Sequence, residues 1–409
     1  MRACKGVEPE FRRRFNAAYT DELYRRYLAD FARNCTAPVD MQVAETPVFL
    51  PADLRRRAER AGGEILDQLC DPARLAKMKA AVPARWEAPR TAAFPSFAII
   101  DFAIVRENGE LTVKLIELQG FPTLIAYETA QFDAWAAALQ TIPGLDVDWT
   151  CWFSGLSRDG FLDLARRTIL GTHAPESTIL MDIDPPSQKT YPDFAATFNL
   201  FGVTPVCPTA LIKRGNKLFR RGGDGREIAV ERIYNRVIFD EVERKNVQLP
   251  FDFRDDLDVE WSPHPNWFWI WSKYSLPYLD HEAVPQATLV SELEVIPNDV
   301  AERYVLKPLF SFAGAGVNVS PTAADVAAIP AEQRSGWCLQ EKIEYAPALQ
   351  ALDGGGVKVE LRMIYLRPDD APTFTLAQNL CRLSRGKMMG VDHNKEHTWV
   401  GSSIGIWPQ

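Results

Sequence analysis

Residues 303–319, RYVLKPLFSFAGAGVNV, constrain the fold more than any other stretch of this sequence. An apolar run ends at Lys307, a loop of small residues that includes Ser311, Gly314 and Gly316 follows, and then comes a second β-branched run. This pattern predicts a strand, a loop and a second strand. Glycine adopts positive φ and lets backbone N–H groups approach an anion, and Lys307 adds a positive charge beside it. We interpret the segment as a lid over nucleotide phosphates, and the alternative is an ordinary hairpin turn with a surface lysine.

A second polar pattern lies on a predicted antiparallel hairpin. Its first strand, residues 97–105, is apolar apart from Asp101 in its middle, and an Asn-Gly turn signal leads into the second strand, residues 111–119. Glu117 and Gln119 are two residues apart on the second strand, so they project from one face. Burying such groups is costly unless a cation compensates, and Mg²⁺ prefers oxygen ligands of this kind. The hairpin therefore predicts a magnesium site, and the alternative is a solvent-facing hairpin with routine acids.

The composition excludes several classes of protein. With 409 residues, 46% of them hydrophobic and 24% charged, the chain is typical of globular proteins with two or three domains. A net charge of −8 argues against an extended nucleic-acid-binding surface, and no apolar run reaches the roughly 20 residues that span a bilayer. The seven cysteines include no CxxC pair and the first residues have no apolar signal segment, so we expect reduced thiols and a cytoplasmic location.

Three further positions place charge in or beside predicted strands or aromatic runs. Arg236 lies in the middle of a predicted strand, residues 233–238, where it either pairs with an acid or clamps a substrate carboxylate. Lys273 follows an aromatic run and is either a second phosphate contact or a surface residue. Glu360 and Arg362 alternate with apolar residues on a predicted strand, so they share one face.

In their order along the chain, these motifs resemble those of the ATP-grasp superfamily. The resemblance is greatest to the circularly permuted branch that includes eukaryotic-type glutathione synthetases and glutathionylspermidine synthases. In ATP-grasp ligases a strand Asp precedes a strand with Glu, one spacer and usually Asn, which is similar to Asp101 followed by Glu117 and Gln119. In most of the superfamily this metal hairpin follows the nucleotide lysines, whereas here it precedes Lys307, as in the permuted branch. The resemblance covers about residues 95–409.

This resemblance implies an α+β (mixed α/β) fold with two α+β lobes around the nucleotide and a preceding β-α-β substrate domain. It also implies a carboxylate–amine ligase that joins small-molecule or peptide substrates through an acyl phosphate, with ATP and Mg²⁺ as cofactors. The nucleotide contacts that it implies are Lys273, Lys307, Ser311, Gly314, Gly316, Gln340, Glu341 and Ile343. The metal ligands that it implies are Asp101, Glu117 and Gln119. The candidates for steadying the substrate carboxylate and the developing charge are Arg236, Arg362 and Arg382.

We expect five segments along the chain. They are a mostly helical segment (1–94), the metal-binding hairpin with its helix (95–150), the β-α-β substrate domain (151–260), the nucleotide lobe (261–350) and the C-terminal lobe (351–409). Within the first segment, apolar residues at helical spacing predict a helix over residues 53–69.

The sequence departs from the family pattern at three points. Ile99 stands where Arg is frequent, Gln119 replaces the usual Asn, and the glycine-rich loop at 311–316 contains no acid. These departures leave open a nucleotide-binding protein that lacks ligase activity and acts through partners. A small-molecule kinase that stops after phosphoryl transfer is a third interpretation.

Overall fold

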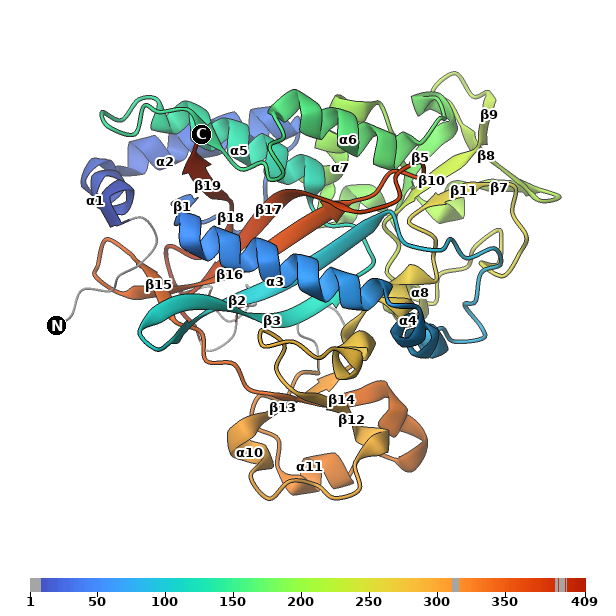
Figure 1. Cartoon of the computed structure of the whole chain (residues 1–409). Helices are drawn as coiled ribbons and strands as arrows, with labels where there is room; N and C mark the ends of the chain where they lie inside the picture. The colour runs from blue at the N-terminus through green and yellow to red at the C-terminus, as the bar shows by residue number, and fades with distance from the viewer. Residues whose placement is uncertain (1–8, 311–315, 387–388, 390–393, 395) are drawn as a thin grey trace.

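The computed structural model describes residues 9–310, 316–386, 389, 394 and 396–409, and an antiparallel sheet lies at its centre (Figure 1). The strands run in the order β18-β17-β16-β2-β3, with β15 paired to β16. Their bounds are β2 Phe97–Glu107, β3 Glu110–Gln119, β15 Pro347–Gln350, β16 Gly356–Leu366, β17 Thr375–Ser384 and β18 Gly401–Ser403. The predicted hairpin is confirmed as β2 and β3, and β2 is buried along its first nine residues because β3 and β16 flank it.

Helix α3 (Ala52–Cys70) crosses one face of this sheet (Figure 1). The predicted helix over residues 53–69 is confirmed, and its apolar stripe is buried against the sheet. The stripe consists of Leu54, Ala58, Ala61, Ile65 and Leu69. A short helix, α4 (Pro72–Met78), follows, and the side chain of Asp71 caps it by accepting a hydrogen bond from the Arg74 amide.

Helix α5 (Ile125–Leu139) covers the other face of the sheet, where Gln378 of β17 donates a hydrogen bond to Thr129 of α5 at 3.3 Å. Most of α5 is buried because further helices pack against its outer side. This explains why its apolar residues follow no single stripe. The remaining long helices are α1 Pro9–Ala18, α2 Asp21–Cys35, α6 Arg158–Leu170 and α7 Tyr191–Phe201.

A four-stranded parallel sheet, in the order β11-β10-β5-β6, confirms the predicted β-α-β order. Its strands are β5 Thr178–Met181, β6 Thr204–Val206, β10 Arg232–Asn235 and β11 Glu260–Ser262. Beside it lie a small antiparallel sheet and two short helices, namely β7 Ile212–Arg214, β8 Lys217–Arg221, β9 Glu227–Val230, α8 Phe239–Arg244 and α9 Trp267–Ile270. The prediction that Arg236 lies in the middle of a strand is wrong, because β10 ends one residue earlier and the chain then turns toward α8.

A smaller lobe follows, at the bottom of Figure 1. It is an antiparallel sheet in the order β12-β14-β13 with a hydrophobic core of its own. Its elements are β12 Ala287–Leu289, α10 Val300–Arg303, β13 Tyr304–Pro308, α11 Ala323–Ala327 and β14 Trp337–Glu341. The strand predicted after the glycine-rich loop is wrong: residues 317–319 contribute only an isolated bridge from Asn318 to Leu306, because Val319 lies exposed without a neighbouring layer to pack on.

Three segments that are far apart in the sequence meet in a third small sheet, in the order β1-β19-β4. Its strands are β1 Val48–Phe49, β4 Trp149–Thr150 and β19 Gly405–Pro408. The main hydrophobic core accordingly draws side chains from Phe15 to Trp407, so the N-terminal helices pack into the same core as the central sheet. Among the described residues, no helix is both long enough and apolar enough to cross a membrane.

Candidate functional site

The site begins at the pair β2–β3, where Asp101 lies directly opposite Glu117. The register shifts after this pair, because Phe102 is opposite Leu115 and Ile116 is left as the extra residue of a bulge. The bulge leaves the Ile116 carbonyl outside the ladder, and this oxygen accepts a hydrogen bond from Lys307 Nζ at 3.4 Å. A lysine from the small lobe is thereby held beside the acids of the central hairpin.

The carboxylate of Asp101 is buried and binds two arginines. Arg362 is opposite Asp101 on β16 and donates from Nε to Oδ1 at 2.7 Å and from Nη2 to Oδ2 at 2.6 Å. Arg382 of β17 lies 3.1 Å from the same Oδ2. Arg362 also donates from Nη1 to the Thr123 hydroxyl at 2.7 Å. Two-pronged pairing of this kind fixes both partners in position and offsets the cost of burying the charge.

A second buried acid, Glu360, extends the cluster. Arg382 binds one of its carboxylate oxygens, and the Tyr345 hydroxyl donates to the other at 2.8 Å. Burial and the charge of Glu360 raise the pKa of Tyr345 well above its ordinary value. Burial alone would lower the pKa of Arg382, but Glu360, Asp101 and Glu117 together raise it. Arg382, whose side chain is 36% exposed, therefore keeps its charge beside the two buried acids.

Two lysines approach the same hairpin from separate segments. Lys273, the first residue of the 3-10 helix η5 (Lys273–Tyr278), is buried, and its Nζ lies 3.2 Å from Glu117 Oε1. Lys307 Nζ donates to Gln340 Oε1 at 2.5 Å in addition to the Ile116 carbonyl. Burial lowers the pKa of Lys307, against the opposing influence of Cys338 and Glu117.

These cations also set the charge state of Glu117. Burial would raise its pKa, but Lys273, then Arg382, Arg362 and Lys307 lower it more, so the net shift is downward. The cluster contains three carboxylates (Asp101, Glu117 and Glu360) against four cations (Lys273, Lys307, Arg362 and Arg382). A net excess of positive charge around buried acids suits a polyanion that arrives with a metal ion.

Gly120 allows the close packing that positions Lys273. It directly follows β3, and its amide donates to the Trp271 carbonyl at 2.9 Å. A Cβ on Gly120 would lie 2.9 Å from the Trp267 carbonyl oxygen, a separation that ordinary side chains do not tolerate. The close approach of α9 to the end of β3, and with it the position of Lys273 two residues after Trp271, therefore requires glycine.

A hollow with a volume of about 10 Å³ lies beside Glu117 and Lys273. Its lining consists of Glu117, Leu118, Gln119, Phe121, Phe268, Ser272, Lys273, Leu309 and Phe310. A volume of this size holds about one water molecule. The hollow is therefore too small, in this structure, for a ligand as large as a nucleotide.

The donor set fits a magnesium ion in part. Glu117 and Gln119 line the hollow together, and Gln119 donates through its Nε2 to the Phe121 carbonyl at 3.1 Å, which leaves its amide oxygen for a cation. Mg²⁺ commonly takes one or two protein carboxylates and completes its shell with phosphate oxygens and water. Asp101 is adjacent, but it would first have to release Arg362. Within the described ranges, no three His, Cys, Asp or Glu side chains form a ready metal cluster.

The other predicted residues lie in several places. Gln340 is buried and bridges the lobe to the hairpin through Lys307 and the Leu115 carbonyl, whereas Glu341 accepts from Arg303 at 2.9 Å. Ile343 follows the end of β14. Gly316 has the positive φ, 73°, that the prediction requires of it. Ser311 and Gly314 lie outside the described residues.

Arg236 lies apart from the cluster. Its Nη1 binds Asp193 Oδ2 at 2.5 Å, and both side chains are buried. Asp193 also accepts the amides of Ala126 and Tyr127, each at 3.0 Å, so it caps the first turn of α5. Of the two roles left open for Arg236, the structure shows the ion pair.

Sequence reasoning assigned no site role to Glu360, Tyr345 or Thr123. The alternation around Glu360 and Arg362 predicts that both lie on one face of a strand. It does not predict which face this is, or which residues that face contacts. The partner of Arg362 comes from β2, because Asp101 is 261 positions earlier in the chain. A register match over that distance leaves no local signal in the sequence.

Comparison with known proteins gives a likeness at the level of the fold. No family model matches the sequence, and no curated protein matches it. Among solved structures, a glutathione synthetase-like effector from Globodera pallida superposes with a TM-score of 0.56 and 13% identity, over 89% of this chain and 94% of that one. A putative gamma-glutamylcysteine synthetase from Methylobacillus flagellatus reaches a TM-score of 0.36 at 12% identity, over 82% and 84% of the two chains. The first of these likenesses confirms the mixed α+β fold of the glutathione synthetase type that the motifs predict.

Proposed function

We propose that this chain is an ATP-dependent carboxylate–amine ligase of the ATP-grasp type, in the circularly permuted order. The observation that carries the proposal is the meeting of Glu117, Lys273 and Lys307 at one hairpin. Lys273 pairs with Glu117, and Lys307 binds the carbonyl of the preceding residue, Ile116. Glu117 and Lys273 also line one hollow. The three residues come from a hairpin, a 3-10 helix and a separate lobe. A fold like that of a glutathione synthetase-like effector supports the same reading.

Lys273 and Lys307 are the donors for the nucleotide phosphates. In the present structure each is held by a group of the protein, Glu117 for Lys273 and Gln340 for Lys307. Glu117 and Gln119, with Asp101 beside them, would hold Mg²⁺, which supplies charge neutralisation between the phosphate oxygens when bound. A substrate carboxylate then takes the γ-phosphoryl group and ADP leaves; an amine attacks the acyl carbon, and phosphate leaves as the amide forms.

Arg362 and Arg382 are the groups that would steady the substrate carboxylate and the charge that develops on it. Asp101 and Glu360 hold these guanidinium groups in fixed positions before any substrate arrives. Such fixed positions matter because a charge that is already oriented stabilises a transition state without reorganisation. Asp101 and Glu360 are in this respect positioning residues.

The test uses the whole chain with ATP, Mg²⁺ and a panel of amino acids and short peptides, and it measures ADP release and amide formation. We expect Lys307→Ala and Glu117→Gln each to lower ADP release by about 100-fold, the usual effect of removing one preorganised electrostatic contact. Lys217→Ala, at an exposed strand position, is the matched control and should leave the rate unchanged. Full ADP release by Lys307→Ala in a folded protein would exclude the proposed role.

A second candidate function is nucleotide binding without ligation. It is favoured by the position of Asp101, whose carboxylate oxygens both bind Arg362 rather than facing the hollow, and by the loop that lacks an acid. Titration calorimetry with ATP and Mg²⁺ separates the two functions. Binding without ADP release over the whole panel supports the second, and ADP release that requires an amine supports the first.

A further inference from the structure

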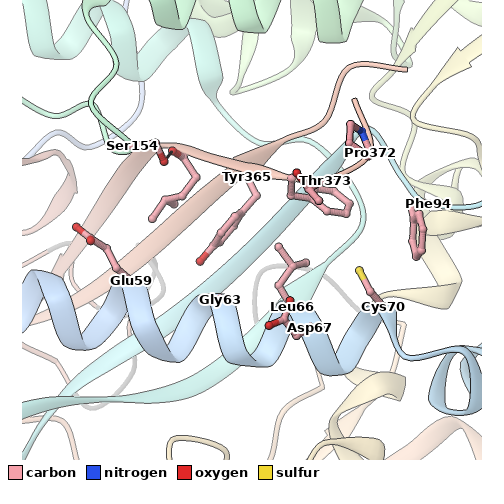
Figure 2. A pocket seen from close by; sticks show the side chains of 12 residues that line it. Glu59, Gly63, Leu66, Asp67, Cys70, Phe94, Ser154, Tyr365, Pro372 and Thr373 are labelled. Carbon is pink, nitrogen blue, oxygen red and sulfur yellow. Dashed lines mark hydrogen bonds between the residues drawn. The ribbon is translucent and has the colours of Figure 1, made fainter. Parts of the chain in front are cut away.

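A cavity of about 480 Å³ lies between helix α3 and the central sheet (Figure 2). The helix contributes Glu59, Gly63 and Asp67, and the sheet contributes Tyr365. Tyr365 is three residues after Arg362 on β16, so it projects from the opposite face of the sheet. The cavity is therefore separate from the charged cluster around Asp101, and its volume is within the range of small-molecule sites.

A buried hydroxyl group without a partner marks this cavity. Tyr365 is 4% exposed, and its hydroxyl oxygen has no hydrogen-bond partner among the described residues. The ring extends from the sheet toward α3, and the hydroxyl end lies beside the helix segment that carries Glu59 and Gly63 (Figure 2). Buried polar groups are almost always paired, so an orphan at the wall of a cavity indicates that a further group completes it.

The acidic residues on the helix place negative charge at the cavity. Glu59 and Asp67 are eight residues apart, a little over two turns, and so lie on one side of α3. Glu59 Oε1 lies 3.4 Å from Arg55 Nε and so forms an ion pair. Within the described ranges, Asp67 forms no ion pair. The nearby guanidinium of Arg367 is taken up by the carbonyl oxygens of three other residues. These carbonyls belong to Phe94, Pro95 and Ala371.

Two adjacent glycines, Gly62 and Gly63, lie within α3 at this point. Packing requires glycine at only one of these two positions. A Cβ on Gly62 would lie 2.2 Å from the Tyr365 hydroxyl oxygen, so Gly62 makes room for that side chain. A Cβ on Gly63 would meet no atom within 4 Å. Glycine inside a helix lowers helix stability relative to alanine, so Gly63 is a local disadvantage that packing does not require.

We propose that this cavity binds a small organic cation, namely an amine attached to an apolar body. The ammonium group is placed beside the Asp67 carboxylate, where a carboxylate ligand would be repelled. The apolar body lies against Leu66, Phe94, Phe374 and Leu376, which also line the cavity. The Tyr365 hydroxyl has almost no accessible surface in this structure, so it becomes a further polar contact only when its ring or α3 shifts.

The first experiment compares three probes of the same shape and different charge with the full-length protein. Phenethylamine, 2-phenylethanol and 3-phenylpropionate are titrated separately and followed by ligand-observed NMR. We expect phenethylamine to bind at least about 10-fold more tightly than 2-phenylethanol, and 3-phenylpropionate to show no binding. Equal binding of the amine and the acid would overturn the charge assignment.

Variants then assign the binding to this cavity. Gly63→Phe fills open space and should abolish binding of phenethylamine, whereas the matched control Gly63→Ala should retain it. Asp67→Asn, at an exposed position, should reduce the preference for the amine over the alcohol to less than about 3-fold. Thermal melting checks that each variant is folded. Undiminished binding by folded Gly63→Phe would overturn the proposal.

Cys70 provides a site-specific measurement on the unaltered protein. It lines the cavity, and burial raises the pKa of its thiol to about 11, so alkylation by iodoacetamide is slow. Peptide mass spectrometry then follows its modification with Cys207, which lies outside the cavity, as the internal control. Saturating phenethylamine should slow alkylation of Cys70 at least about 5-fold and leave Cys207 unchanged. Equal rates at Cys70 with and without the amine would overturn the proposal independently of any variant.

Discussion

The two faces of the central sheet use charge in different ways. On the face that carries Asp101 and Arg362, acids and cations pair closely, and a hollow of about 10 Å³ lies beside Glu117. On the face under α3, an exposed acid and an unpaired hydroxyl surround a cavity of about 480 Å³. The larger space is thus the one with fewer organised charges. Electrostatic stabilisation of a reacting group needs charges in fixed positions, and the first face has them. The second face has the volume that a bound small molecule needs.

The largest difference between the faces should appear when Arg362 is removed. Arg362→Ala leaves Asp101 buried with only Arg382 beside it, so we expect the free energy of unfolding to fall by about 3–5 kcal/mol. Urea denaturation measures this. Arg167→Ala, which breaks the exposed pair with Asp370, is the control and should cost less than about 1 kcal/mol. Equal losses in the two variants would show that the buried cluster is not held by its charges.

The glycines on the two faces should respond with opposite sign. Gly120→Ala places a Cβ against the Trp267 carbonyl, so we expect a loss of about 1–3 kcal/mol, together with lower ADP release as Lys273 shifts. Gly63→Ala adds a methyl group in open space and should stabilise the protein by about 1 kcal/mol. Thermal melting of both variants provides the comparison. A stabilised Gly120→Ala would contradict the close approach of α9 to β3.

A smaller effect is expected in the pH dependence of stability. The neighbouring cations hold the pKa of Glu117 below its ordinary value of 4.5 in spite of burial. Ionised Glu117 therefore stabilises the fold above pH 4.5, and that contribution is lost as the pH falls from 4.5 through the folded value. The difference in stability between wild type and Glu117→Gln should shrink over this window, as measured by urea denaturation at closely spaced pH values.

Glu59 on the other face should show the reverse trend. Burial raises its pKa above 4.5, against the influence of Arg55 and Arg56. Its protonated form is favoured in the folded state, so its contribution is complete below pH 4.5 and is lost as the pH rises through the folded value. In the same titration, the free energy of unfolding of Glu59→Gln should increase relative to that of wild type as the pH rises. Parallel curves for the two variants would remove the electrostatic distinction between the faces.

The sequence predicts the elements that depend on local patterns. Alternation and an Asn-Gly turn give the hairpin that carries Asp101 and Glu117, helical spacing gives α3, and the β-α-β order gives the parallel sheet. Each rests on a period of two or of 3.6 residues that tertiary packing then preserves. The roles of Asp101, Glu117, Gln119, Lys273 and Lys307 stay predictions, although the structure gathers these residues at one hairpin.

Other features depend on distant registers and could not be predicted in this way. The bulge at Ile116 is a register shift between β3 and β2, and its carbonyl binds Lys307, which comes from another lobe. Glu360 acquires its partners only when β16 pairs with β2 and β17. The cavity under α3 depends on where the helix is placed over Tyr365, which its own apolar stripe does not specify.

The pairing of β2 with β16 also has a consequence for synthesis. The two partners Asp101 and Arg362 are 261 positions apart. At about 5–20 residues per second, the ribosome takes roughly 13–52 s to make this interval. Throughout that time the apolar strand β2 has β3 on one edge and nothing on the other, which is the condition under which strands associate wrongly. Limited proteolysis of chains stalled before and after residue 366 would measure when this edge becomes protected.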